Sequence, residues 1–91
     1  MMVTTEKIQL NTKGDCDVID ITSQVSQAIR ESELDSGVIT IFVSGSTAGV
    51  TTVEYEPGLV HDLQVLFERI APKGIDYRHN LRWGDGNGHA H

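Results

Sequence analysis

The sequence predicts an α+β fold, a mainly antiparallel sheet with helices packed on one face, from three patterns. Residues 7–12 alternate apolar and polar side chains, as a half-buried strand does, and residues 16–21 follow as a second strand after a turn at 13–15. Residues 38–44 are apolar on both faces and rich in β-branched side chains, which favours a covered central strand. Residues 59–70 repeat leucine and isoleucine at helical spacing.

The two expected helices have start and stop signals. Thr22 can cap the first helix, because its hydroxyl can accept a free backbone N–H of the first turn. The Asp-Ser-Gly sequence at 35–37 stops this helix. Pro57 opens the second helix and Pro72 ends it. The sequence therefore predicts one helix after each pair of strands.

The remaining segments complete the order of elements. Residues 50–56 resume as a strand after an interruption at 45–49, and the periodicity fades from 73 to 82, which we expect to be loop. A chain of 91 residues holds one domain at most. The predicted order is therefore β-β-α-β-β-α-loop in a single domain over residues 1–91.

Charge and composition exclude some classes of partner. The net charge is −6 and the isoelectric point is near 4.9, so the chain gains nothing from the phosphate neutralisation that dominates nucleic-acid binding. The N-terminus lacks the basic start and apolar run of a signal peptide, and no apolar run approaches the roughly 20 residues of a membrane helix. The single cysteine, Cys16, fits a reducing compartment. We expect a cytoplasmic protein that contacts neither nucleic acid nor membrane.

The chain closes with a dense polar segment, WGDGNGHAH, at residues 83–91. The two terminal histidines would share one face of a strand, but on a helix they would point about 200° apart. The alternative is a solvated tail whose histidines have no role, because no fixed-spacing metal motif is matched. The segment gathers groups that suit proton transfer, zinc or another divalent ion, namely Asp85, Asn87, His89 and His91, with His79 upstream as a third imidazole.

Three further positions carry alternatives. Gly45, Ser46 and Thr47 between two expected strands form either a small anion-binding nest or a plain turn. Glu54 lies mid-strand between apolar neighbours, so its carboxylate either faces water or acts in an apolar site as a general base or acid. Asp62 stands near the start of the second helix, where a carboxylate favours the helix dipole.

Three segments are recognisable together: STAGVTTVEYEPGLVHDL at 46–63, the lone His79 in the expected loop, and the closing D-x-N-x-H-x-H pattern within 83–91. They resemble the YjbQ-like family, also called the secondary thiamine-phosphate synthase family, and the whole chain is similar to the N-terminal part of that family. The resemblance implies an α+β sheet sandwich, a compact homotrimer and a helix that begins within 85–91. It also implies that family members continue past His91 with further strands, before which this chain stops.

The resemblance also implies a site and an activity. The implied activity is weak thiamine-phosphate synthesis, which joins a phosphorylated hydroxymethylpyrimidine to a thiazole phosphate with loss of pyrophosphate. The alternatives are a non-catalytic trimer that binds a metal or an anion, and an inactive fragment. The expected site comprises Glu54, His79, Asp85 and Asn87 as catalytic groups, His79, His89 and His91 as ligands of a divalent metal such as zinc or magnesium, and Ser46, Thr47 and Asp62 as contacts of a small phosphorylated molecule.

Overall fold

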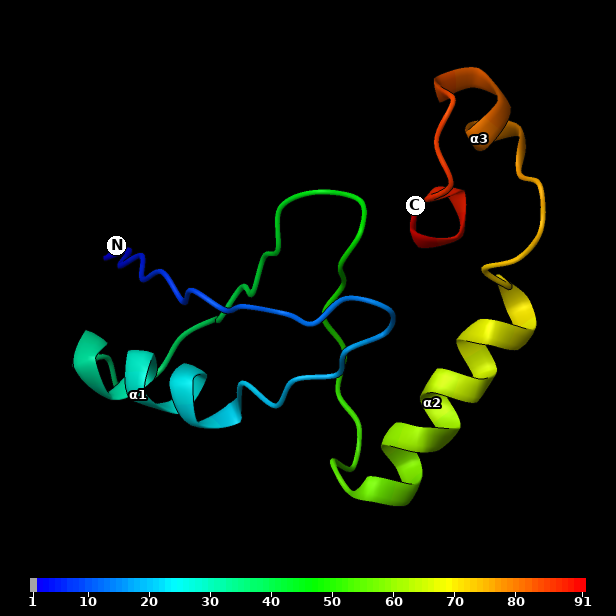
Figure 1. Ribbon diagram of the computed structural model, residues 1–91. Helices are drawn as coiled ribbons and strands as arrows, with labels where there is room; N and C mark the ends of the chain where they lie inside the picture. The colour runs from blue at the N-terminus through cyan, green and yellow to red at the C-terminus, as the bar shows by residue number, and fades with distance from the viewer. Residues whose placement is uncertain (1) are drawn as a thin grey trace. The chain divides into compact units, whose positions relative to one another are not determined.

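The computed structural model describes residues 2–91, which fall into two compact units, residues 2–40 and residues 41–91. The first unit contains helix α1 (Thr22–Ser32). The second contains helices α2 (Pro57–Ile70) and α3 (Arg78–Trp83) and the 3-10 helix η1 (Gly88–Ala90), all visible in Figure 1. Within residues 2–91 no helix has the length and apolar character needed to cross a membrane.

The predicted antiparallel sheet, and with it the α+β fold class, is wrong, because residues 2–91 form no strand. The segment 38–44, expected to be a covered central strand, leaves Val38 94% exposed and Phe42 83% exposed. A strand exists only when a neighbouring strand pairs with its backbone N–H and C=O groups, and an apolar pattern does not supply that partner. The four expected strands are irregular backbone here.

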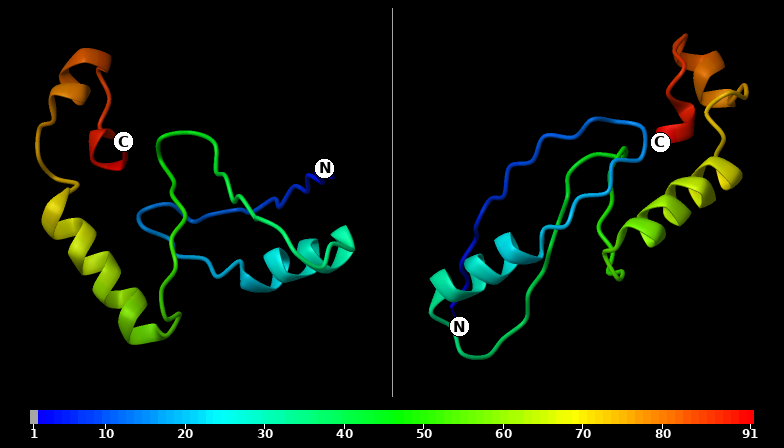
Figure 2. Two further views of the ribbon diagram at one scale, coloured as in Figure 1. Left: turned by 180° about the vertical axis from the view of Figure 1, so that it is seen from behind. Right: turned by 60° about the horizontal axis from the view of Figure 1, so that its bottom comes forward.

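The turn expected between the first two strands is present although the strands are not. Gly14, Asp15 and Cys16 adopt left-handed φ values of 81°, 49° and 62°, and the chain reverses direction there (Figure 2). The backbone N–H of Lys13 donates to Asp17 Oδ2 at 2.9 Å across this turn. Two consecutive non-glycine residues in the left-handed region carry a steric cost, which this side-chain hydrogen bond helps to offset.

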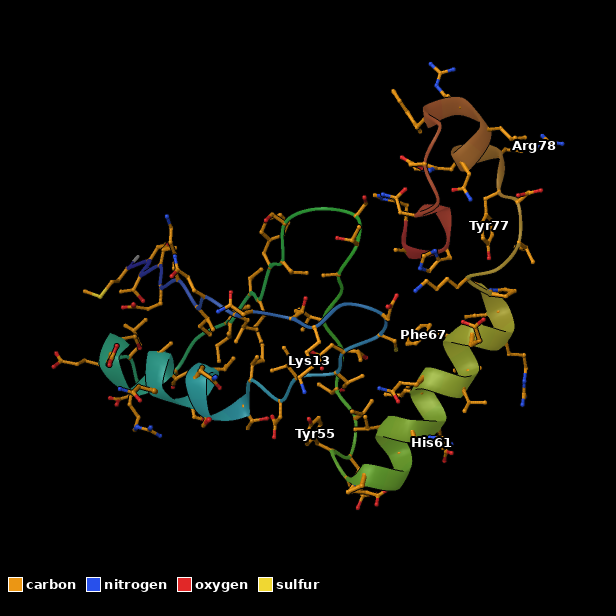
Figure 3. All side chains as sticks on the ribbon, in the orientation of Figure 1. Lys13, Tyr55, His61, Phe67, Tyr77 and Arg78 are labelled. Atoms are coloured by element: carbon orange, nitrogen blue, oxygen red, sulfur yellow. The ribbon has the colours of Figure 1, made fainter. Side chains whose placement is uncertain are left out.

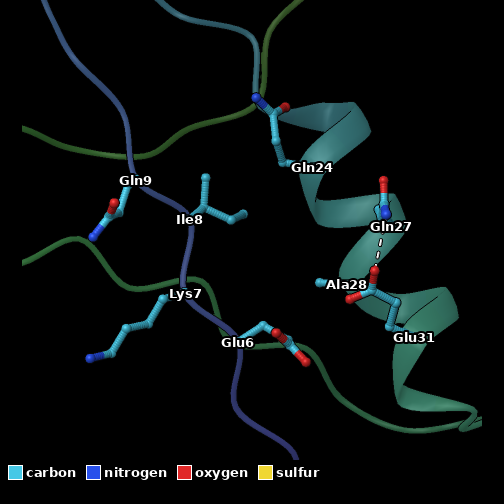
Figure 4. Close-up of a pocket in the computed structure, with 8 residues that line it drawn as sticks. All are labelled: Glu6, Lys7, Ile8, Gln9, Gln24, Gln27, Ala28 and Glu31. Atoms are coloured by element: carbon cyan, nitrogen blue, oxygen red, sulfur yellow. Dashed lines mark hydrogen bonds between the residues drawn. The ribbon is translucent and has the colours of Figure 1, made fainter.

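A shallow groove of about 300 Å³ lies between the N-terminal segment and α1 (Figure 4). Ile8 and Ala28 supply its apolar surface. On the rim, the amide of Gln27 donates to Glu31 Oε1 at 3.0 Å along the helix. The groove is lined on both sides mainly by polar residues, namely Glu6, Lys7, Gln9, Gln24, Gln27 and Glu31.

Thr22, predicted as the cap of the first helix, is instead the first residue of α1, and the N-cap position is held by Ile21, which makes no side-chain cap hydrogen bond. Thr22 donates both its hydroxyl, at 2.6 Å, and its backbone N–H, at 2.9 Å, to Asp20 Oδ1. The carboxylate of Asp20, rather than the hydroxyl of Thr22, therefore satisfies the first free donor of the helix. At the other end the Ser32 hydroxyl donates to the carbonyl of Ile29 at 2.6 Å, and Glu33 turns left-handed at φ 59°. These contacts end the helix before the predicted stop.

Helix α2 confirms the helix predicted between Pro57 and Pro72. Pro57 occupies the first turn, where its missing N–H is not needed. The side chain of Glu56 accepts the backbone N–H of Leu59, which caps the helix. Leu59 is half-buried, whereas Ile70 at the far end of the same apolar stripe is 65% exposed.

The loop predicted at 73–82 is wrong in part, because residues 78–83 form α3. Tyr77 lies on the connection that follows α2 (Figure 3), and its hydroxyl donates to the carbonyl of Pro72 at 2.7 Å. Gly84 ends α3 with φ 69°, and its N–H donates to the carbonyl of Asn80 at 2.8 Å. Trp83 is 64% exposed, so it does not pack into a core. The guanidinium of Arg82 lies over its ring, 5.3 Å from the ring centroid.

Lowering the pH is expected to weaken the start of α1. Hydrogen bonds from the hydroxyl and the backbone N–H of Thr22 hold the pKa of the Asp20 carboxyl below its ordinary value of 3.8. A carboxylate with a lowered pKa stabilises the folded state above its ordinary pKa, and this contribution is lost as the pH falls through the lowered pKa. The Cα chemical shifts of residues 22–25 should therefore move toward coil values below pH 3.8.

The variant Asp20→Asn keeps an oxygen acceptor but carries no charge that titrates. Its α1 shifts should stay constant over the same pH range. Asp35→Asn, which removes a carboxylate beyond the end of α1, is the matched control and should keep the wild-type response. A wild-type pH response in Asp20→Asn would contradict the assignment.

Candidate functional site

A hydroxyl and an imidazole from the two ends of the second unit meet at hydrogen-bond distance. Ser46 Oγ lies 2.6 Å from His91 Nδ1, although 45 positions separate the residues. Ser46 lies in a bend that begins at Gly45. The backbone of Gly45 has a φ of 94°, which a glycine adopts without strain. A hydroxyl and an imidazole at this distance can pass a proton between oxygen and nitrogen.

His79 from α3 extends this pair into a cluster. Its ring stacks on that of His91, with centroids 4.6 Å apart and planes inclined by 24°. On its other side, His79 Nδ1 lies 3.5 Å from Asp85 Oδ1 in the turn after α3. The two side chains are 33% and 40% exposed, so water screens this contact and its energy is small. The stacked geometry brings the rings of His79 and His91 into direct contact.

Asp85 is oriented by Asn87. In the amide orientation that satisfies both groups, the Asn87 side-chain N–H donates to Asp85 Oδ1 at 2.9 Å and to Oδ2 at 3.3 Å. These distances are shorter than the contact between Asp85 and His79. We name the group Ser46, His79, Asp85, Asn87 and His91 the polar cluster. All five were expected at the site, and within residues 2–91 they lie together.

Two ring nitrogens near the C-terminus are buried without a hydrogen bond. Within residues 2–91, His79 Nδ1 and His89 Nδ1 have no hydrogen-bond partner, and the 3.5 Å contact of His79 with Asp85 lacks hydrogen-bond geometry. A buried polar atom without a partner is costly, and a bound group that contacts it removes the cost. In the same part of the chain no three side chains of His, Cys, Asp or Glu are grouped so that they could hold a metal ion.

The other expected residues lie elsewhere. Glu54 is exposed, and no hydrogen bond or ion pair joins it to the polar cluster within residues 2–91. Thr47 is exposed next to Ser46. Asp62 lines a separate shallow groove on α2 with Val65, Leu66 and Arg69. The structure therefore gathers the hydroxyl, imidazole and amide groups and leaves Glu54 and Asp62 apart from them.

Sequence reasoning missed two residues beside the polar cluster. The side-chain oxygen of Asn80 accepts the backbone N–H of Gly88 at 2.8 Å, and Tyr77 packs against the same glycine. Asn80 and Tyr77 stand in the segment predicted as loop, and no local pattern marks either one. The glycine at position 84 was the available signal for α3, since a left-handed glycine commonly follows the last residue of a helix.

Comparison with known proteins identifies one family. The family model described as UPF0047 protein YjbQ-like matches residues 6–91. A UPF0047 protein of Methanothermobacter thermautotrophicus is 32% identical over 91 residues, which are 100% of this chain and 62% of that protein. The UPF0047 protein MJ1081 of Methanocaldococcus jannaschii is 33% identical over 86 residues, 93% of this chain and 59% of that protein.

A bacterial relative matches to a similar degree. The UPF0047 protein YugU of Bacillus subtilis is 31% identical over 86 residues, 92% of this chain and 62% of that protein. The chain therefore spans about three fifths of the length of these relatives. No solved structure matches the chain.

Replacing Ser46 by alanine should change the imidazole of His91 and leave His61 unchanged. The substitution removes the hydroxyl oxygen Oγ, which lies 2.6 Å from His91 Nδ1. Side-chain ¹⁵N spectra should therefore show the Nδ1 resonance of His91 moving by several ppm. His61 is exposed on α2 and serves as an internal reference in the same spectrum. An unmoved His91 resonance would show that the hydrogen bond is not formed in solution.

Proposed function

We propose, from the premise that this chain belongs to the UPF0047 protein YjbQ-like family, that it is an enzyme of phosphorylated small molecules in which Ser46 and His91 carry the proton transfer. The observation that supports this most directly is the 2.6 Å separation of Ser46 Oγ and His91 Nδ1. The match of the family to residues 6–91 supports applying its expected chemistry to this chain.

The specific reaction proposed is thiamine-phosphate synthesis. A carbon–oxygen bond of the pyrimidine pyrophosphate breaks, and its electron pair leaves with the pyrophosphate. The nitrogen of the thiazole phosphate then forms the new carbon–nitrogen bond. Negative charge grows on the bridging oxygen as it leaves, so a positioned O–H or N–H donor lowers the barrier. The hydroxyl of Ser46 and the imidazole of His91 are the donors proposed for that oxygen, and the proton that they transfer leaves with the pyrophosphate.

The rest of the polar cluster orients these donors. His79 stacks on His91 and limits the directions that its ring can take. Asp85 lies beside His79 and is itself held by Asn87, so the three residues act as a support behind the imidazole pair. Glu54 lies apart from the polar cluster, so the histidine rather than the glutamate is proposed for the proton transfer.

The assay uses the 91-residue chain with the pyrimidine pyrophosphate, the thiazole phosphate and Mg²⁺. Thiamine phosphate should form, and His91→Ala should reduce kcat by about 10²–10⁴-fold, the usual contribution of a general acid or base. Glu54→Gln should keep the wild-type rate. Wild-type protein that forms no more product than His91→Ala would overturn the proposal.

A second candidate is a trimer that binds a divalent ion without turnover, and a separate observation favours it. The Nδ1 atoms of His79 and His89 are buried and have no hydrogen-bond partner within residues 2–91. Imidazole nitrogens suit zinc, so the donor type fits. The carboxylate of Asp85 lies 3.5 Å from His79 Nδ1, but within residues 2–91 no three such side chains are grouped to hold an ion, so this candidate needs ligands from another copy of the chain. When bound, such an ion would supply a positive charge that attracts phosphate oxygens.

Elemental analysis and sedimentation test the second candidate together. The purified wild-type chain should retain close to one zinc ion per chain and sediment as a trimer. His89→Ala should lose the zinc, whereas His61→Ala, on the exposed face of α2, should keep it. Equal zinc content in wild type and His89→Ala would show that His89 does not bind the ion.

A further inference from the structure

The 3-10 helix that precedes His91 is fixed to α3 by one side chain. The backbone N–H of Gly88, the first residue of η1, donates to Asn80 Oδ1 at 2.8 Å. Both groups are partly buried, so water competes less for this hydrogen bond than for those on the surface. Asn80 stands in α3 immediately after His79. This hydrogen bond therefore joins α3, which carries His79, to η1, which precedes His91.

The same contact leaves no room for a side chain at position 88. A Cβ atom placed on Gly88 would lie 2.5 Å from Asn80 Oδ1 and 2.9 Å from Tyr77 Cβ. Atoms do not approach so closely, so any other residue would push η1 away from α3. Close backbone approach is the reason that glycine is needed here, since its φ lies outside the left-handed region.

The position of Gly88 determines the position of His91. The backbone N–H of His91 donates to the carbonyl of Gly88 at 3.3 Å, which completes the turn of η1. His91 then reaches Ser46 with Nδ1 and stacks on His79 with its ring face. His79 and Asn80 are neighbours in α3. This one short helix therefore carries both the ring that stacks on His91 and the side chain that binds the turn before His91.

We propose that Asn80 is a positioning residue of the polar cluster, which holds His91 within reach of Ser46 by accepting the N–H of Gly88. This inference rests on the proposed function for its effect on rate, but its effect on the geometry of His91 is independent of any activity. In this role Asn80 acts through the backbone of η1, because it binds Gly88 and Gly88 in turn binds His91.

The first experiment compares Asn80→Ala with Asn80→Asp in the full 91-residue chain. Alanine removes the acceptor oxygen, and aspartate keeps one at the same distance along the side chain. In side-chain ¹⁵N spectra, the His91 Nδ1 resonance of Asn80→Ala should move to the position that it takes in Ser46→Ala. In Asn80→Asp it should return to the wild-type position. The Cα shifts of α3 report whether the helix survives each substitution.

The outcomes separate positioning from mere stability. Rescue by Asn80→Asp supports the proposal. Asn80→Ala with a wild-type His91 resonance overturns it, and so does Asn80→Asp that behaves like alanine while α3 stays helical. If Asn80→Ala loses α3, Gly88→Ala provides the second variant, because it leaves every side chain of α3 intact and displaces only η1. A wild-type His91 resonance in Gly88→Ala would also overturn the proposal.

Kinetics then distinguish this inference from the proposed function. Where thiamine phosphate is formed, Asn80→Ala should lower kcat by about tenfold to a hundredfold, the effect of misplacing a catalytic group by about 1 Å. KM should stay within about twofold, since Asn80 is proposed to act through η1 and not on the substrate. If no variant or wild type forms product, the proposed function fails while the spectra still decide the role of Asn80.

Discussion

Hydrogen bonds between side chains and backbone hold the elements of this chain, because hydrophobic burial contributes little within it. No residue from 2 to 91 is buried. Helices α1 and α2 each begin at a carboxylate that accepts a backbone N–H, Asp20 for Thr22 and Glu56 for Leu59. Each bond is local and exposed, so it fixes the start of one element without fixing its neighbours.

Hydrogen bonds between side chains and backbone also hold the segments around the polar cluster, and these bonds are partly buried. The hydroxyl of Tyr77 holds the connection from α2, and the side chain of Asn80 holds η1. Both bonds are shielded from water more than those at the helix starts. Both come from residues close in sequence to His79. The imidazole pair therefore depends on two residues that carry no chemistry of their own.

Helices α1 and α2 were predictable, unlike α3, because their signals are local. Pro57, the leucine spacing and Pro72 determine α2 within one segment, and the structure agrees. A strand needs a partner, and that partner can lie far away in the sequence. The apolar run at 38–44 therefore predicted burial without showing what would cover it. The grouping of His79 with Asp85 and His91 followed from their closeness in sequence. The contact of His91 with Asn80 through Gly88 had no such signal.

The distances within the polar cluster show which of its groups already have a hydrogen-bond partner and which are available to a bound group. Asn87 donates to both oxygens of Asp85, at 2.9 and 3.3 Å, whereas His79 Nδ1 lies 3.5 Å away and makes no hydrogen bond within residues 2–91. Asn87 therefore orients the carboxylate, and His79 Nδ1 remains available. His91 Nδ1 is committed to Ser46. A bound group that enters the polar cluster would satisfy His79 Nδ1 without breaking an existing bond, and would compete with Ser46 only if it needed His91.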